Sequence, residues 1–167
     1  MEHEGAVEAA SALTDLSGKY LTFELAREVY ELEILKVQEI MGLMEVTKVP
    51  KLPDYVRGVI NLRGKVIPVI ELRLKFDMDT TEDTDRTCII VVQVATESHD
   101  VTMGIIVDEV KEVLDIQQNQ IEPTPSFGTS VNTSFIMGMG KTEENVIMLL
   151  DVDKVLTMLE LESITKS

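Results

Sequence analysis

The chain has 167 residues and a formal net charge of −15 at pH 7, which repels nucleic-acid phosphates and anionic lipid surfaces alike. Hydrophobic residues make up 44% of the sequence, enough for the core of one domain or of two small ones. No apolar run is long enough to cross a bilayer, and the first residues lack the pattern of a secretory signal. We therefore expect a cytoplasmic protein that neither binds nucleic acid nor inserts into a membrane.

Short strands are predicted along most of the chain, after a flexible N-terminal tail over residues 1–17. In residues 20–25, apolar and polar side chains alternate, as in a strand with one buried face. Residues 30–37 are predicted to form the strand that follows it. A second pair of the same kind is predicted further on, over residues 88–94 and 101–107.

Residues 55–76 form the clearest predicted hairpin. Two apolar runs flank the basic tip Arg63-Gly64-Lys65, where glycine supplies the positive φ of a tight turn. Pro68 cannot donate a hydrogen bond to a sheet, so its part of the second strand is predicted to lie at an edge, a bulge or a strand end. The tip of this hairpin is available to a binding partner.

The hairpin is repeated later in the chain. Residues 55–76 align without a gap on residues 135–156, so that Gly58 meets Gly138 and Val66 meets Val146. Upstream, residues 32–50 align on residues 105–123, and the spacing in residue number between aligned positions is slightly smaller there. The difference between the two spacings lies in the polar residues 124–134, which we interpret as a longer loop in the second copy.

Each copy therefore consists mainly of four or five short strands. A flat sheet of this size would leave exposed edges, so we predict two small closed or nearly closed barrels. After the second hairpin, residues 152–161 carry apolar side chains at helical spacing and predict a short C-terminal amphipathic helix.

The residue types needed for catalysis are poorly placed. His3 lies in the tail and His99 in a predicted turn, so neither is positioned for acid–base work. The neighbouring carboxylates at Asp108-Glu109 and at Asp151 with Asp153 are interpreted as solvated surface. Cys88 lies in an apolar run and is predicted to be a buried thiol. No metal-ligand spacing or phosphate-binding loop is present, and we expect no cofactor and no enzymatic activity.

Five segments together resemble the CheW family of bacterial chemotaxis coupling proteins. They are Ile-Leu-Lys-Val-Gln-Glu-Ile at residues 34–40, Gly-Val-Ile-Asn-Leu-Arg-Gly at 58–64, Pro-Val-Ile-Glu-Leu-Arg at 68–73, Gly-Ile-Ile-Val-Asp-Glu-Val at 104–110 and Ile-Glu-Pro-Thr-Pro at 121–125. Each motif is modest by itself, but their order and spacing are specific. The resemblance covers residues 18–159.

The resemblance implies a fold and a function. The fold is all-β, with two five-stranded SH3-like β-barrels in tandem, over about residues 18–84 and 85–159, with or without exchange of strands between them. Residues 160–167 are then a C-terminal tail. The function is that of a non-enzymatic adaptor, which couples methyl-accepting chemoreceptors to the CheW-like regulatory domain of the histidine kinase CheA in membrane-associated arrays.

Arg63 is the strongest candidate for a partner contact. An exposed hairpin arginine usually serves solubility, but its counterpart in the second copy is Glu143, so the scaffold does not require a cation there. A guanidinium presents a fork of donors to carboxylates or carbonyls. The receptor-binding region implied by the CheW resemblance includes this arginine, and Asn61 lies in the same turn.

The resemblance also implies an apolar receptor groove at the junction of the barrels, on the segments that carry Val37, Glu39, Ile89 and Val110. Val37 and Val110 are counterparts in the two copies, and barrel core is an equally good interpretation of both. For Gly58 and Gly64, backbone geometry is the better explanation, and an effect on binding would be indirect.

Two alternative functions stay open at this level. A coupling protein for a chemosensory-like pathway with an output other than taxis would carry the same motifs. A small hydrolase would instead use the acidic groups around Asp108 or Asp151.

Overall fold

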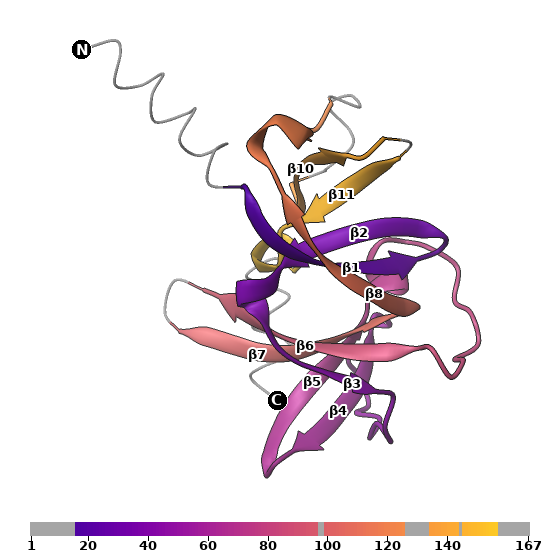
Figure 1. Cartoon of the computed structure of the whole chain (residues 1–167). Helices are drawn as coiled ribbons and strands as arrows, with labels where there is room; N and C mark the ends of the chain where they lie inside the picture. The colour runs from indigo at the N-terminus through magenta and orange to yellow at the C-terminus, as the bar shows by residue number, and fades with distance from the viewer. Residues whose placement is uncertain (1–15, 97–98, 126–133, 144, 157–167) are drawn as a thin grey trace.

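The computed structural model of the chain describes residues 16–96, 99–125, 134–143 and 145–156, and its strands fall into two groups (Figure 1). A six-stranded sheet has the order β8-β1-β2-β11-β10-β9, and a five-stranded sheet has the order β3-β6-β7-β5-β4. The six strands are β1 (Gly18–Leu25), β2 (Glu28–Glu33), β8 (Glu109–Ile116), β9 (Ile121–Glu122), β10 (Ile136–Lys141) and β11 (Val146–Leu150). The five strands are β3 (Val37–Gly42), β4 (Val56–Leu62), β5 (Lys65–Glu71), β6 (Cys88–Ala95) and β7 (Asp100–Val107).

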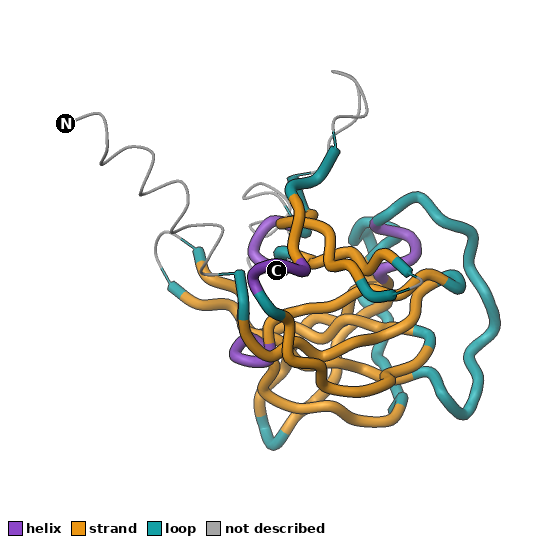
Figure 2. The backbone as a smooth tube through the Cα atoms, turned by 45° about the horizontal axis from the view of Figure 1, so that its top comes forward, coloured by secondary structure: helices purple, strands orange, loops and turns teal. Residues whose placement is uncertain are grey.

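Within the described residues, helices are short and lie between strands or after the last one (Figure 2). They are the α-helix α2 (Leu72–Lys75) and three 3-10 helices, η1 (Ile34–Lys36), η2 (Gln118–Gln120) and η3 (Val152–Lys154). The helix predicted over residues 152–161 begins as η3, and residues 157–161 lie outside the described part of the chain. The sequence did not predict α2, which follows β5 as η3 follows β11. Within the described residues, no helix is long and apolar enough to cross a membrane.

The two sheets form two small barrels, so the predicted all-β fold is confirmed. The five-stranded sheet has the predicted number of strands, whereas the other has six, because the two-residue β9 forms a separate strand. In the five-stranded sheet, Thr47 bonds with Val59 and so joins the chain after β3 to β4 at the opposite edge. In the six-stranded sheet, the chain passes from β8 at one edge through η2 to β9 at the other. We call the five-stranded sheet the first barrel and the six-stranded sheet the second barrel.

The two barrels contain strands from both copies of the repeat. The β1–β2 hairpin pairs with β8 and β11 in the second barrel, whereas β6 and β7 pair with β3 and β5 in the first. The strand predicted over residues 30–37 is therefore wrong in one respect. It is broken by η1, because the chain must leave the second barrel after Glu33 before it enters the first at Val37.

Both predicted hairpins are present, as β4–β5 and β10–β11. Pro68 pairs with β4, but the ladder between β5 and β7 begins only at the next residue, so its missing N–H lies at the end of that ladder. The predicted loop over residues 124–134 falls mostly on residues 126–133, which lie outside the described part.

Three apolar clusters form the core. The largest contains side chains from both sheets and includes Phe23, Leu32 and Ile105. A second cluster fills the first barrel, and a smaller one, formed by Tyr20, Ile116 and Leu149 with partly buried neighbours, lies in the second. Cys88 was predicted to be buried, but it is half-buried at the border of the shared cluster.

Candidate partner-binding site

The tip of the β4–β5 hairpin is a tight turn that depends on Asn61, Arg63 and Gly64. Arg63 and Gly64 both have positive φ, of 51° and 86°, which is the geometry of a turn that matches the twist of paired strands. The Asn61 side chain accepts a hydrogen bond from the Gly64 amide, with an N–O distance of 2.8 Å. Asn61 and Gly64 therefore fix the direction in which Arg63 leaves the turn.

The Arg63 guanidinium is not free, because it bonds to Glu39 on β3. Its Nη1 lies 2.9 Å from Glu39 Oε2, and its Nη2 bonds to the same oxygen. The Arg63 side chain is 70% exposed and that of Glu39 is 30% exposed. An ion pair in this environment adds little to stability. Its structural effect is to hold two of the predicted site residues together on the surface of the first barrel.

Gly58 acts through the closure of the first barrel. Thr47 and Val59 exchange two backbone hydrogen bonds of 2.9 Å, and a Cβ atom at Gly58 would lie 2.1 Å from the Thr47 carbonyl oxygen. Its counterpart in the second barrel, Gly138, has the Glu122 carbonyl oxygen 3.0 Å from the same position. The backbone therefore approaches too closely for a side chain, as the sequence predicted for Gly58.

The three predicted apolar contacts occupy different places. Val37 on β3 and Val110 on β8 are partly buried and pack against the cluster shared by both barrels. Ile89 on β6 is completely buried inside the first barrel. A partner cannot touch the Ile89 side chain in this structure, so its predicted receptor contact is corrected to a role in packing.

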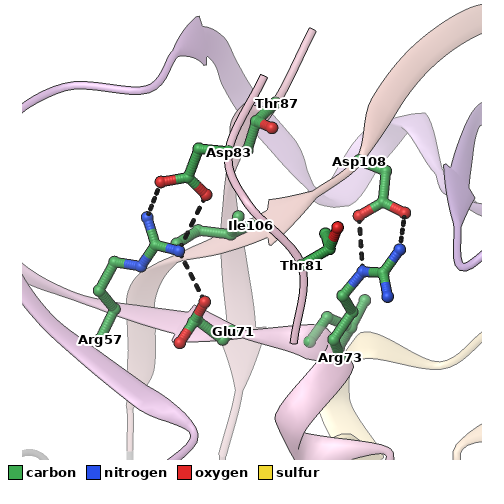
Figure 3. Close-up of a pocket in the computed structure, with 9 residues that line it drawn as sticks. Arg57, Glu71, Arg73, Thr81, Asp83, Thr87, Ile106 and Asp108 are labelled. Carbon is green, nitrogen blue, oxygen red and sulfur yellow. Dashed lines mark hydrogen bonds and ion pairs between the residues drawn. The ribbon is translucent and has the colours of Figure 1, made fainter. Parts of the chain in front are cut away.

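The sequence did not predict a partly buried ion pair that lies at the crossover from β7 to β8. Arg73 on α2 bonds to both carboxylate oxygens of Asp108, with Nε 2.9 Å from Oδ1 (Figure 3). Asp108 also accepts the Ala26 amide at 2.8 Å. Burial alone would raise the Asp108 pKa, but these two donors lower it below its ordinary value. The interpretation of Asp108 as solvated surface was therefore wrong.

A second arginine in the same region holds the loop before β6. Arg57 on β4 bonds to both carboxylate oxygens of Asp83 and, at 2.7 Å, to Glu71. The hydrogen bond with Asp83 is the main cause of its raised pKa. The pocket between the two arginines has a volume of only about 20 Å³, so it has room for a water molecule and not for a substrate (Figure 3).

The crossover at η1 carries a third ionic contact. Lys36 Nζ lies 2.8 Å from Asp153 Oδ2, and the other oxygen of Asp153 accepts the Ala95 amide at 2.8 Å. Asp153 is therefore also not a free surface group. Each of these ion pairs joins residues that are separated in the sequence and carry no motif, although arginines in an otherwise acidic chain are a signal that acidic partners lie nearby.

The geometry favours a binding surface over a reaction centre. Within the described residues, no three His, Cys, Asp or Glu side chains are grouped as metal ligands would be. The carboxylates beside the small pocket between Arg57 and Arg73 bond to one or the other of these arginines. The exposed feature among the predicted site residues is the Arg63–Glu39 pair, with Asn61 supporting the turn.

Comparisons with known proteins agree with this description. Residues 19–160 match the family model described as a CheW-like domain. The chain is 37% identical to the chemotaxis protein CheW of Klebsiella aerogenes over 143 residues, which covers 86% of this chain and 84% of the relative. It is 34% identical to CheW of Rhizobium meliloti over 155 residues, covering 93% of this chain and 97% of that one.

A solved structure shows the same fold. The scaffolding protein TtCheW from Thermoanaerobacter tengcongensis superimposes with a TM-score of 0.72 at 37% identity, over 81% of this chain and 89% of the other. The two interleaved barrels described above are therefore the CheW arrangement of two SH3-like barrels. From the family match over nearly its whole length, its relatives and its fold, this chain belongs to the CheW-like family of chemotaxis scaffold proteins.

Proposed function

We propose that the chain is a non-enzymatic adaptor that couples chemoreceptors to the histidine kinase CheA. The cytoplasmic tip of a receptor binds the surface that carries Glu39, Asn61 and Arg63, and the barrels pair with the related regulatory domain of CheA. Holding both partners in one cytoplasmic, membrane-associated array raises their effective concentration and lets receptor conformation bias the kinase. No chemistry by the adaptor is required.

The observation that carries the receptor contact is the exposed Arg63–Glu39 pair. The second barrel has Glu143 at the place of Arg63, so the shared scaffold does not require a basic tip. The pair shields part of the guanidinium but leaves the side chain 70% exposed. A carboxylate or carbonyl of the receptor can bond to it there. Val37 and Val110, partly buried, are proposed as the apolar border of the same receptor surface, with Gly58 and Gly64 acting through the backbone.

Co-sedimentation with receptor-bearing membranes and CheA tests the proposal. We expect the wild-type chain to sediment with both partners. Arg63→Ala is expected to weaken receptor capture about 30-fold, as for a central contact in an interface. Glu143→Ala removes the charge at the equivalent tip of the second barrel and is expected to leave capture unchanged. A wild-type chain that binds neither partner would contradict the adaptor function.

A charge exchange separates recognition from structure. In the double variant Glu39→Arg with Arg63→Glu, the ion pair between β3 and the hairpin is kept with its polarity reversed. If the pair only stabilises the barrel, this variant captures receptors as the wild type does. We expect it to fold normally by circular dichroism and to lose capture, because the receptor then meets a carboxylate in place of the guanidinium.

A further inference from the structure

Glu31, in the middle of β2, is a buried carboxyl group without a partner among the described residues. Its side chain is completely buried, and neither carboxylate oxygen is hydrogen-bonded to any of these residues. Buried polar groups in proteins are nearly always hydrogen-bonded, and an unpaired charge in the interior is very costly. None of the roles described above uses this residue.

The alternation of β2 places Glu31 inside the second barrel. Its neighbours Tyr30 and Leu32 belong to the cluster shared by both barrels, so Glu31 lies on the opposite face. Across the sheet it stands opposite Thr22 on β1 and Leu149 on β11. The Thr22 hydroxyl is already bonded to the backbone of Glu112, at 2.8 and 3.0 Å.

The first barrel shows that the scaffold does not need an acid here. Val69 pairs with Gly104 in the first barrel, and the equivalent pair in the second barrel is Leu149 with Glu31. Gly104 thus occupies the place of Glu31, and a Cβ atom there would lie 2.7 Å from a methyl carbon of Ile89. At this position the first barrel has a glycine packed against an apolar side chain, whereas the second barrel has a buried carboxyl group.

In the described part of the chain, no basic side chain compensates the charge of Glu31. Burial raises its pKa from 4.5 to about 7. The ionisable groups nearby are Tyr20 on β1, whose pKa is raised by burial and by Glu33 and Glu31, and Glu33 on the same strand, whose pKa burial also raises. β11 presents apolar residues, Leu149 among them.

Glu31 also lies in a short ladder of the second barrel. The parallel ladder between β2 and β11 consists of Tyr30 with Met148 and Glu31 with Leu149. This seam connects the β1–β2 hairpin to the β10–β11 hairpin. The corresponding ladder of the first barrel, between β5 and β7, has one more pair. Hydration of Glu31 therefore requires only a short seam to open.

We propose that Glu31 is a proton-dependent weak point of the second barrel: its protonated side chain allows the β2–β11 seam to close, and its ionisation favours opening of that seam to water. Glu31 binds its proton more tightly when the seam is closed than when it is open. The stability of the closed seam therefore decreases as the pH rises from about 4.5 to about 7, and it does not decrease further above that range.

Amide hydrogen exchange measured by NMR tests this proposal. Between about pH 5.5 and about pH 8, protection of the β2 and β11 amides, corrected for the intrinsic exchange rate, is expected to fall about 30-fold in the wild type. Glu31→Gln keeps the shape without the charge and is expected to show no such fall. Glu28→Gln changes an exposed acid of the same strand and should behave as the wild type.

Several results would overturn the proposal. One is protection of β2 and β11 that does not change with pH in the wild type, and another is an equal change in Glu31→Gln. An equal loss in the β5–β7 ladder would show a global effect. If Glu31→Gln does not fold, a ¹³C titration of the wild-type Glu31 carboxyl decides: a midpoint near pH 7 is expected, and one near the ordinary 4.5 contradicts the proposal.

Discussion

Gly58 is the single residue on which closure of the first barrel most directly depends. The Thr47 carbonyl oxygen occupies the space that a Cβ atom would need, and the neighbouring Val59 makes both hydrogen bonds of the closing bridge. The glycine has φ of +156°, so a side chain would add backbone strain to the collision. Because the bridge also places the β4–β5 hairpin, Gly58 affects the candidate site indirectly.

Gly58→Ala is expected to destabilise the protein by about 3 kcal/mol or more, because it strains the backbone and breaks the bridge. Urea unfolding followed by circular dichroism measures the change. Gly42→Ala is the matched control, since a Cβ atom at Gly42 meets nothing within 4 Å, and its stability is expected to stay within about 1 kcal/mol of the wild type. Equal stability of the two variants would contradict the role given to Gly58.

At the scale of elements, the crossovers between the barrels are held by ion pairs. Asp108, where the chain passes from β7 to β8, connects α2 of the first barrel with the β1–β2 turn of the second through Arg73 and Ala26. Lys36 and Asp153 do the same between η1 and η3. These contacts link segments of the two barrels in addition to the apolar packing of the shared cluster.

Asp108→Asn is expected to lower the free energy of unfolding by about 2 kcal/mol at neutral pH, because Arg73 loses a charged partner. The depressed Asp108 pKa means that this stabilisation is present above about pH 4 and disappears as the pH falls through the folded-state value. Denaturation measured from about pH 7 to about pH 2 should therefore show that the difference in the free energy of unfolding between wild type and variant disappears in acid. Asp115→Asn, at an exposed position of β8, is the control, and a gap independent of pH would refute the assignment.

For the whole molecule, neither copy of the repeat contains a complete barrel. The first barrel needs β6 and β7 from the later part of the chain, and the second needs β1 and β2 from the start. The shared cluster collects side chains from both sheets. Aromatic rings extend this contact, with Phe76 after α2 stacked on Phe135 before β10 at a centroid distance of 4.6 Å.

A fragment of residues 18–84, the barrel boundary predicted from the sequence, is therefore not expected to fold alone. It would leave one hydrogen-bonding edge of each of β1, β2 and β5 without a partner strand. Circular dichroism and a ¹H–¹⁵N spectrum should show an unfolded chain, and addition of residues 85–159 is expected to restore strand structure. A dispersed spectrum from the first fragment by itself would contradict the interleaved arrangement.

The predictions that succeeded depend on local pattern. The glycine at position 64 correctly predicts a tight turn. Alternation in residues 20–25 correctly predicts the buried face with Leu21, Phe23 and Leu25, but Tyr20 and Thr22 on the other face are buried as well. The predictions that failed depend on what lies opposite a residue. Ile89 and Asp108 lie on predicted strands or at their ends, but the sequence does not say that the first faces the barrel interior and the second faces Arg73.

The sequence by itself determined the β character, the two copies, the basic tip and the family, because these follow from periodicity and motif order along the chain. Only the tertiary structure decided which hairpin joins which barrel, that Arg63 bonds to Glu39 and that Glu31 is buried without a partner among the described residues. Local periodicity shows which side chains of a strand share a face, but it does not show their partners. A partner comes from elsewhere in the chain, 24 positions away for the Arg63–Glu39 pair and 82 for Ala26 with Asp108, so its identity is fixed only when the sheets assemble.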